Sequence, residues 1–245
     1  MTEHTSVVLA RRPQGNPVPE DFDLLRGPVP TPGPGQALVK NHYISLDAGF
    51  RNWMNEGAGD EVLPAMPIGA QVMGLVMGEV LESRHPDYAP GDWLMARIAW
   101  QEYSLADDSH FIVKIDPEEP YPMNYYLGVL GDTGLSAYFG MTDIGKPQPG
   151  ETVLVSAAGG AVGSIAGQLA KIAGAGAVGI AGGEDKCRRL VDELGYDAAI
   201  NHRGDLAAQF DAACPDGIDV YFDNVGGPLL ETVLERINVG ARIAL

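Results

Sequence analysis

The sequence has few basic residues and no long apolar run. Lys and Arg number 16 against 33 Asp and Glu in 245 residues, a formal net charge of −17. Binding to a nucleic-acid backbone needs a basic stripe or patch, and this sequence has none, so we expect no nucleic-acid partner. No stretch reaches the roughly 18 consecutive apolar residues that span a bilayer, so we expect no membrane partner either. The dispersed acidic residues favour a soluble, self-repelling surface.

Cysteine is almost absent, with Cys187 and Cys214 as the two examples. Two cysteines cannot build a disulfide framework, and this usage fits a reducing cytoplasm. Neither cysteine has a partner at the spacing of a metal site, and the five histidines are scattered along the chain. We therefore predict a cytoplasmic protein without a metal site.

The first half of the chain, residues 1–125, alternates short apolar runs with proline-rich and glycine-rich turns. Turn sequences such as TPGPG at Thr31–Gly35 and APGD at Ala89–Asp92 separate the runs. Short strands punctuated in this way predict a compact β domain. The expected strands are Val7–Leu9, Ala37–Tyr43, Gln71–Glu82, Trp93–Ile98 and Glu102–Leu105.

From residue 126 to residue 245 the pattern changes to strands that alternate with amphipathic helices. This alternation predicts βαβ units and a doubly wound parallel sheet, so the fold class is α/β with two domains. The expected strands are Glu151–Ala157, Ala177–Ala181, Asp197–Asn201, Ile218–Asp223 and Ala241–Leu245. The expected helices are Val162–Ala173, Asp185–Leu194, Asp205–Cys214 and Leu229–Ile237.

The last expected strand, Ala241–Leu245, coincides with the end of the sequence. Sheets of this type usually have about six strands, so we expect the sequence to be a fragment truncated at its C-terminus. We also expect this strand to lie in the interior of the sheet, beside Ile218–Asp223. Its far edge would then need another strand to cover it.

A glycine-rich loop, SAAGGAVG at Ser156–Gly163, joins the first strand and first helix of the second domain. Against the dinucleotide motif G-x-G-x-x-G it reads A-x-G-x-x-G, with Ala158 at the first glycine position. Gly160 would let backbone N–H groups approach a pyrophosphate, and Gly163 would let the helix pack closely on the strand. The flanking strand and helix favour nucleotide binding over a merely tight turn. The residues expected to bind the cofactor here are Gly160, Ala161, Val162 and Gly163.

The choice between NADPH and NADH depends on the end of the second strand. NAD enzymes place Asp or Glu there, about 20 residues beyond the loop, to hold the ribose 2′-hydroxyl. Here the position is Gly182 or Gly183, which leaves room for a 2′-phosphate. Lys186 is the preferred phosphate partner, and Arg203 follows the third strand. The acidic residues Glu184 and Asp185 favour NADH, unless their role is to cap the helix that begins there. The alternative for Lys186 is that it lies on a solvated helix face and binds no phosphate.

Asn224, in FDNVGG after the fourth strand, lies where cofactors bind in doubly wound folds. Its side chain is a candidate hydrogen-bond partner for the ribose or the nicotinamide. The alternative is an Asx turn that leads into the helix at Pro228.

Four stretches of the second domain resemble the medium-chain dehydrogenase/reductase superfamily: GDTGLSAYFG, KPQPGETVLVSAAGGAVGSIAGQLAK, GIAGGEDKCRRLVDELGYDAAIN and PDGIDVYFDNVGG. More narrowly, they resemble its zinc-independent branch of prostaglandin, alkenal and curcumin reductases. Motifs at Tyr43–Met54, Ala89–Trp93 and Trp100–Leu105 are similar to that branch as well. The resemblance implies a GroES-like catalytic domain at 1–125, a Rossmann NADP-binding domain at 126–245, and a homodimer.

The resemblance also implies an activity, the NADPH-dependent reduction of the carbon–carbon double bond of α,β-unsaturated ketones and aldehydes. Tyr43 and Arg51 are the candidates for contact with the substrate. The alternative for Tyr43 is packing within its strand. The alternative for Arg51 is an ion pair at the surface or between the domains. Thr133 is a candidate near the nicotinamide, and its alternative is a helix N-terminal turn. His202 stands where the branch commonly has a tyrosine near the 2′-phosphate. An NADPH quinone reductase and a catalytically silent nucleotide-binding protein remain alternative functions.

Overall fold

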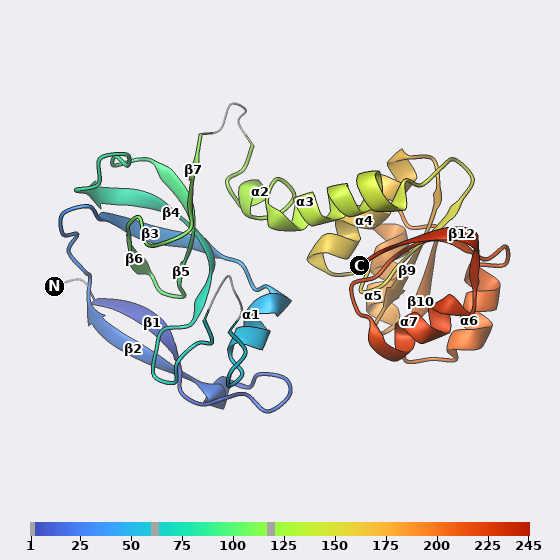
Figure 1. The fold of residues 1–245 in the computed structure, drawn as a ribbon, viewed down its shortest axis with the longest axis horizontal. Helices are drawn as coiled ribbons and strands as arrows, with labels where there is room; N and C mark the ends of the chain where they lie inside the picture. Colours follow the sequence, from blue (N-terminus) through green and yellow to red (C-terminus); the bar gives the residue numbers. More distant parts are fainter. Residues whose placement is uncertain (1–2, 60–63, 117–120) are drawn as a thin grey trace. The chain divides into compact units, whose positions relative to one another are not determined.

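The computed structural model describes residues 3–59, 64–116 and 121–245. The chain divides into two compact units, Met1–Leu127 and Gly128–Leu245 (Figure 1). Within the described residues, no helix combines the length and the apolar character that a bilayer crossing demands.

The first unit is built on an antiparallel sheet with strand order β6-β3-β4-β5-β7, beside the hairpin β1-β2. Its core gathers apolar side chains from the sheet and from the short helix α1 (Ala48–Trp53), among them Phe50, Leu75 and Met95. A 3-10 turn at Pro19–Asp21 and the helix α2 (Asn124–Leu127) complete the unit. The strands are β1 (Glu3–Leu9), β2 (Phe22–Pro28), β3 (Ala37–Ile44), β4 (Met73–Ser83), β5 (Trp93–Ala99), β6 (Tyr103–Ala106) and β7 (Ile112–Ile115).

All five strands expected in this half are present, and the structure adds β2 and β7. Strand β2 escaped prediction because its apolar residues do not alternate. Leu24 and Leu25 are adjacent and both are exposed, so the strand shows no period of two. Strand β7 shows no alternation either, because its two end residues are half-buried and its two middle residues are exposed.

The second unit is a parallel sheet with strand order β10-β9-β8-β11-β12. Successive residues of β8 point to opposite faces, and both faces are buried. Val153 and Val155 pack with α4 and α5, whereas Leu154 packs with α6 and α7. Helices therefore cover both faces, and the predicted doubly wound sheet is confirmed. The strands are β8 (Thr152–Val155), β9 (Gly176–Ala181), β10 (Ala198–Asn201), β11 (Ile218–Phe222) and β12 (Ile237–Ala244). The helices are α3 (Asp132–Phe139), α4 (Ala161–Ile172), α5 (Glu184–Asp192), α6 (Leu206–Ala213) and α7 (Gly227–Leu234).

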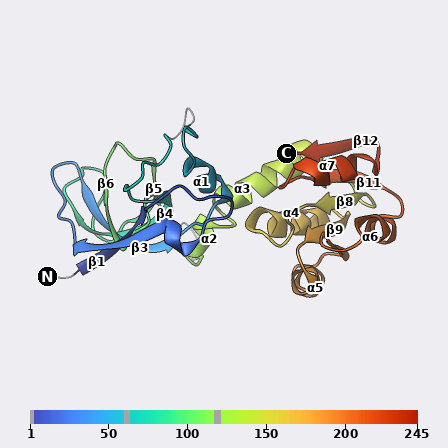
Figure 2. The ribbon, with the colours of Figure 1, turned by 90° about the horizontal axis from the view of Figure 1, so that it is seen from below.

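The second unit differs from expectation in helix α3, which was not expected, and in the bounds of α7 and β12. Helix α3 continues into a helical turn, η2 (Gly140–Gly145), and the two form one green-to-yellow rod in Figure 2. The helix expected at Leu229–Ile237 ends at Leu234, and β12 begins at Ile237 rather than at Ala241. Gly240, with a φ of +85°, hides this strand because a glycine within an apolar run suggests a turn.

The pairing predicted for the last strand is confirmed. Strand β12 runs parallel to β11, with Tyr221 opposite Ile243 and Phe222 opposite Ala244. Among the described residues, β12 is the outer strand of the sheet rather than an interior one.

Candidate nucleotide-binding site

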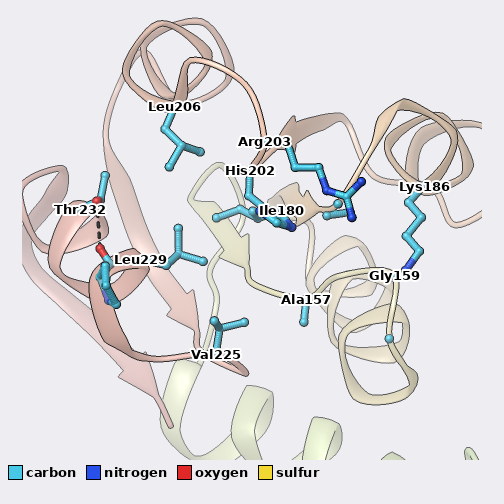
Figure 3. A pocket seen from close by; sticks show the side chains of 14 residues that line it. Ala157, Gly159, Ile180, Lys186, His202, Arg203, Leu206, Val225, Leu229 and Thr232 are labelled. Atoms are coloured by element: carbon cyan, nitrogen blue, oxygen red, sulfur yellow. Dashed lines mark hydrogen bonds between the residues drawn. The ribbon is translucent and has the colours of Figure 1, made fainter. Parts of the chain in front are cut away.

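A cavity of about 540 Å³ opens at the carboxyl ends of strands β8, β9 and β10 (Figure 3). Its walls come from the loop after β8, the end of β9, the first turn of α5, the loop after β10, the start of α6, the loop after β11, and α7. In a doubly wound sheet this edge is where ligands bind, because the loops that leave successive strands diverge there. The whole cavity belongs to the second unit.

The glycine loop forms one side of this cavity. Gly160 lines it and is the residue immediately before helix α4, and no side chain caps that helix end. Ala161 and Val162 form the first turn, where backbone N–H groups have no partner within the helix. Gly163 is buried, and a Cβ there would lie 2.6 Å from the carbonyl oxygen of Ala157. The helix can therefore approach the strand closely only because residue 163 is glycine.

The end of β9 is a tight position for a side chain. A Cβ on Gly182 would lie 2.8 Å from Nε2 of His202, which also lines the cavity. Gly183 follows with a φ of +93°, a backbone conformation that favours glycine. The Nδ2 atom of Asn201 donates a hydrogen bond to Glu184 at 2.7 Å, so this carboxylate is already engaged. The site therefore lacks the carboxylate that would select a ribose 2′-hydroxyl.

Two cations, Lys186 and Arg203, line the same cavity. Figure 3 shows their side chains extending from α5 and from the loop after β10. Within the part of the chain that the structure describes, neither has an ion-pair partner, whereas Arg188 on the same helix pairs with Asp185. Unneutralised cations in a chain with a net charge of −17 are suited to an anionic ligand. Lys186 is the residue that the sequence predicts as the partner of a 2′-phosphate, and the structure places Arg203 in the same cavity.

The opposite wall of the cavity is apolar. Leu206, Val225 and Leu229 lie across from Lys186 in Figure 3. Such a wall suits a flat heteroaromatic ring, and the cavity thus pairs an apolar half with a cationic half. These three residues were missed as ligand contacts. The one sequence feature that could have identified them is their position, because each follows a strand at the carboxyl edge of the sheet.

Asn224 does not line the cavity. Its Nδ2 atom donates to the carbonyl oxygen of Ser156 at 2.9 Å, and its backbone N–H donates to the Ser156 hydroxyl at 2.8 Å. The side chain therefore bridges the loops after β8 and β11. This arrangement was not among the sequence alternatives, which were a cofactor contact and an Asx turn.

The three remaining candidates, Thr133, Tyr43 and Arg51, each have local surroundings that the structure describes. In the second unit, the Thr133 hydroxyl donates to the carbonyl oxygen of Gly128 at 2.9 Å, in the first turn of α3. In the first unit, Tyr43 lies on β3 with 40% of its surface exposed. Arg51 on α1 donates hydrogen bonds to the carbonyl oxygens of Pro13 and Gly15, at 3.0 and 2.8 Å. The structure thus brings together Gly160, Lys186 and His202, and within the second unit Thr133 is not among the residues that line the cavity.

Comparison with known families places this geometry in context. Residues 5–114 match a family described as the N-terminal domain of oxidoreductase. Residues 161–245 match a family described as zinc-binding dehydrogenase. In the described ranges, no three His, Cys, Asp or Glu side chains form a group that could hold a metal ion.

Among individual proteins, the chain is 44% identical over 237 residues to the NADPH-dependent curcumin reductase of Escherichia coli, covering 96% of this chain and 68% of that protein. It is 38% identical over 245 residues to the NADP(+)-dependent 2-alkenal reductase of Nicotiana tabacum, covering 98% of this chain and 71% of that one.

The solved structures agree with these matches. The crystal structure of CurA in complex with NADPH from Vibrio vulnificus superposes with a TM-score of 0.86 at 40% identity. The match covers 98% of this chain and 70% of that one, so the chain spans about 70% of the length of such relatives. This chain belongs to the medium-chain dehydrogenase/reductase superfamily, in the branch that contains the curcumin and alkenal reductases.

Proposed function

We propose that this protein reduces the carbon–carbon double bond of α,β-unsaturated ketones and aldehydes, with NADPH as the hydride donor. The observation that carries the proposal is the cavity at the carboxyl edge of the sheet. It combines the uncapped start of α4, a glycine at the end of β9, and the unpaired cations Lys186 and Arg203. The relatives named NADPH-dependent curcumin reductase and 2-alkenal reductase support the same chemistry.

The cavity offers partners for the pyrophosphate, the 2′-phosphate and the adenine of a phosphorylated dinucleotide. The N–H groups at the start of α4 would hold the pyrophosphate, since a helix N-terminus carries partial positive charge. Lys186, Arg203 and His202 would hold the 2′-phosphate, and the apolar wall that includes Leu229 would receive the adenine. Bound NADPH supplies the hydride, and the protein supplies orientation and electrostatics.

On the substrate side, hydride addition to the β-carbon places negative charge on the carbonyl oxygen. A hydrogen-bond donor aimed at that oxygen stabilises the enolate. We assign this role to the Tyr43 hydroxyl, which makes no hydrogen bond to the rest of the described chain. We assign Arg51 an indirect role, because its bonds to the carbonyl oxygens of Pro13 and Gly15 hold the loop that precedes the turn at Pro19–Asp21.

A cytoplasmic location and a homodimer are part of the same proposal. The free thiols of Cys187 and Cys214 support the location, because reduced cysteines are the normal state in the cytoplasm. Burial raises the pKa of the Cys214 thiol to about 11, so this group stays protonated and unreactive at neutral pH. The homodimer rests on the family resemblance.

The function is tested by following NADPH absorbance with an alkenal, an enone and a quinone as separate substrates. We expect NADPH to be consumed with the alkenal and the enone, and the product to keep its carbonyl group and lose its double bond, as NMR spectroscopy will detect. Turnover of the quinone alone would point to a quinone reductase instead. Tight NADPH binding without turnover of any substrate would point to a silent nucleotide-binding protein.

A further inference from the structure

We propose that Ser156 and Asp223 are positioning residues for dinucleotide binding. Together they hold Ala157 in a left-handed backbone conformation that directs the glycine loop toward the phosphates. This inference rests on the proposed function, because it takes the cavity beside Ala157 to be the NADPH site. It assigns a task to two buried polar residues that do not line the cavity.

The first observation is a buried hydrogen-bond network around one carboxylate oxygen. Oδ1 of Asp223 accepts from the Ser156 hydroxyl at 3.0 Å and from the Tyr221 hydroxyl at 2.8 Å. The same oxygen accepts from the backbone N–H groups of Val225 and Gly226, at 2.9 and 2.8 Å. Burial alone would raise the pKa of Asp223, but these hydrogen bonds hold that pKa below its usual range. One charged oxygen thus joins the loop after β11 to the loop after β8.

The second observation is that both neighbours of Ala157 are fixed. Ser156 accepts two hydrogen bonds from Asn224, and its own N–H donates to the carbonyl oxygen of Phe222 at 3.0 Å. On the other side, the N–H of Ala158 donates to the carbonyl oxygen of Ile180 at 3.0 Å. The chain therefore enters and leaves Ala157 in directions set by the sheet.

The third observation is the conformation of Ala157 itself. Its φ is +46°, and the one other non-glycine residue with a positive φ in the described ranges is Lys146. An alanine populates this region about tenfold less readily than a glycine, so the surroundings must impose it. Ala157 is exposed and lines the cavity, and its carbonyl oxygen accepts from Gly160 at 2.8 Å.

The left-handed turn has a direct consequence for anion binding. Within the described residues, the N–H groups of Ala157 and Gly159 have no acceptor. Ala157 and Gly159 both line the cavity, so their free N–H groups are available to an anionic ligand there, whereas the N–H of Ala158 between them is held by Ile180. The network at Asp223 therefore fixes, ahead of binding, the loop shape that the phosphates require.

The test is a calorimetric titration of NADPH into four proteins. They are the wild type, S156A, A157G and S156A/A157G. Glycine adopts the left-handed conformation freely, so A157G removes the need for the network. We expect S156A to weaken NADPH binding about tenfold in the wild-type background and less than about threefold in the A157G background. A network that merely stabilises the fold would give equal losses in both backgrounds.

The matched control is S109A, which also removes a serine hydroxyl bonded to a carboxylate, that of Asp107 in the first unit. This control should leave the affinity unchanged in both backgrounds. D223N provides a second test, because it keeps the shape of the side chain but weakens the hydrogen-bond acceptor. Like S156A, it should weaken NADPH binding more in the wild-type background than in the A157G background. Equal losses in the two backgrounds, or no loss from S156A, would overturn this inference alone. A wild-type protein that does not bind NADPH would overturn the proposed function and this inference with it.

Discussion

Replacing Gly160 with valine is expected to lower NADPH affinity by more than about 100-fold, since the loop would lose at least two charge-assisted phosphate contacts. A Cβ at this position already lies 3.1 Å from the carbonyl oxygen of Ala157, which is a tight contact. The two methyl groups of valine would extend from that Cβ into the space in front of helix α4. The measurement is a titration of NADPH into wild type and G160V, with the thermal unfolding of both recorded.

The control for this substitution is G27V, on strand β2 of the first unit. A Cβ on Gly27 meets no atom within 4 Å, and valine suits a strand. G27V should therefore bind NADPH as the wild type does. NADPH affinity retained by a folded G160V protein would show that the start of α4 does not bind the phosphates.

Removing the two cations of the cavity is expected to abolish the preference for NADPH over NADH. A charge-assisted contact contributes about 1.5–3 kcal/mol, so K186A alone should weaken NADPH binding by about 10-fold to 100-fold. K186A/R203A should weaken it further, toward the affinity for NADH. The affinity for NADH should change little in either variant, because NADH has no 2′-phosphate. Titrations of both cofactors into each protein give the selectivity directly.

R188A is the matched control, because it removes the same charge from the same helix. The Arg188 side chain pairs with Asp185 and does not line the cavity. It should therefore leave the selectivity as it is in the wild type. Equal losses of NADPH and NADH affinity in K186A would mean that Lys186 contacts a part of the cofactor that both share.

Much of the second unit could be predicted from sequence because its elements are regular. Strand β9 and helix α4 follow directly from a buried apolar run and a helical apolar period. Helix α3 was not expected, because Leu135, Tyr138 and Phe139 remain exposed and leave no clear buried face. The strand expected at Ala241–Leu245 was shorter than β12, because Gly240 within β12 suggests a turn.

The candidate site could be predicted where its residues lie close together in the sequence. Lys186 lies 30 residues after Ser156, on the helix that directly follows the unit β8-α4-β9, so sequence spacing places it with the glycine loop. Arg203 joins Lys186 only through the pairing of β10 with β9, which spacing does not specify. The strain at Ala157 was not predictable, because nothing in the letters SAAGG marks which residue turns left-handed.

Phosphorus NMR of bound NADP⁺ shows whether Lys186 and Arg203 surround the 2′-phosphate of the cofactor. The second ionisation of a free phosphate monoester has a pKa of about 6. Two adjacent cations favour the dianion and so lower this pKa. We therefore expect the 2′-phosphate signal of the bound cofactor to stay at the dianion position as the pH falls from about 8 to about 5. In K186A/R203A the signal should move through this range again. A wild-type signal that titrates as it does in free NADP⁺ would contradict this placement of the two cations.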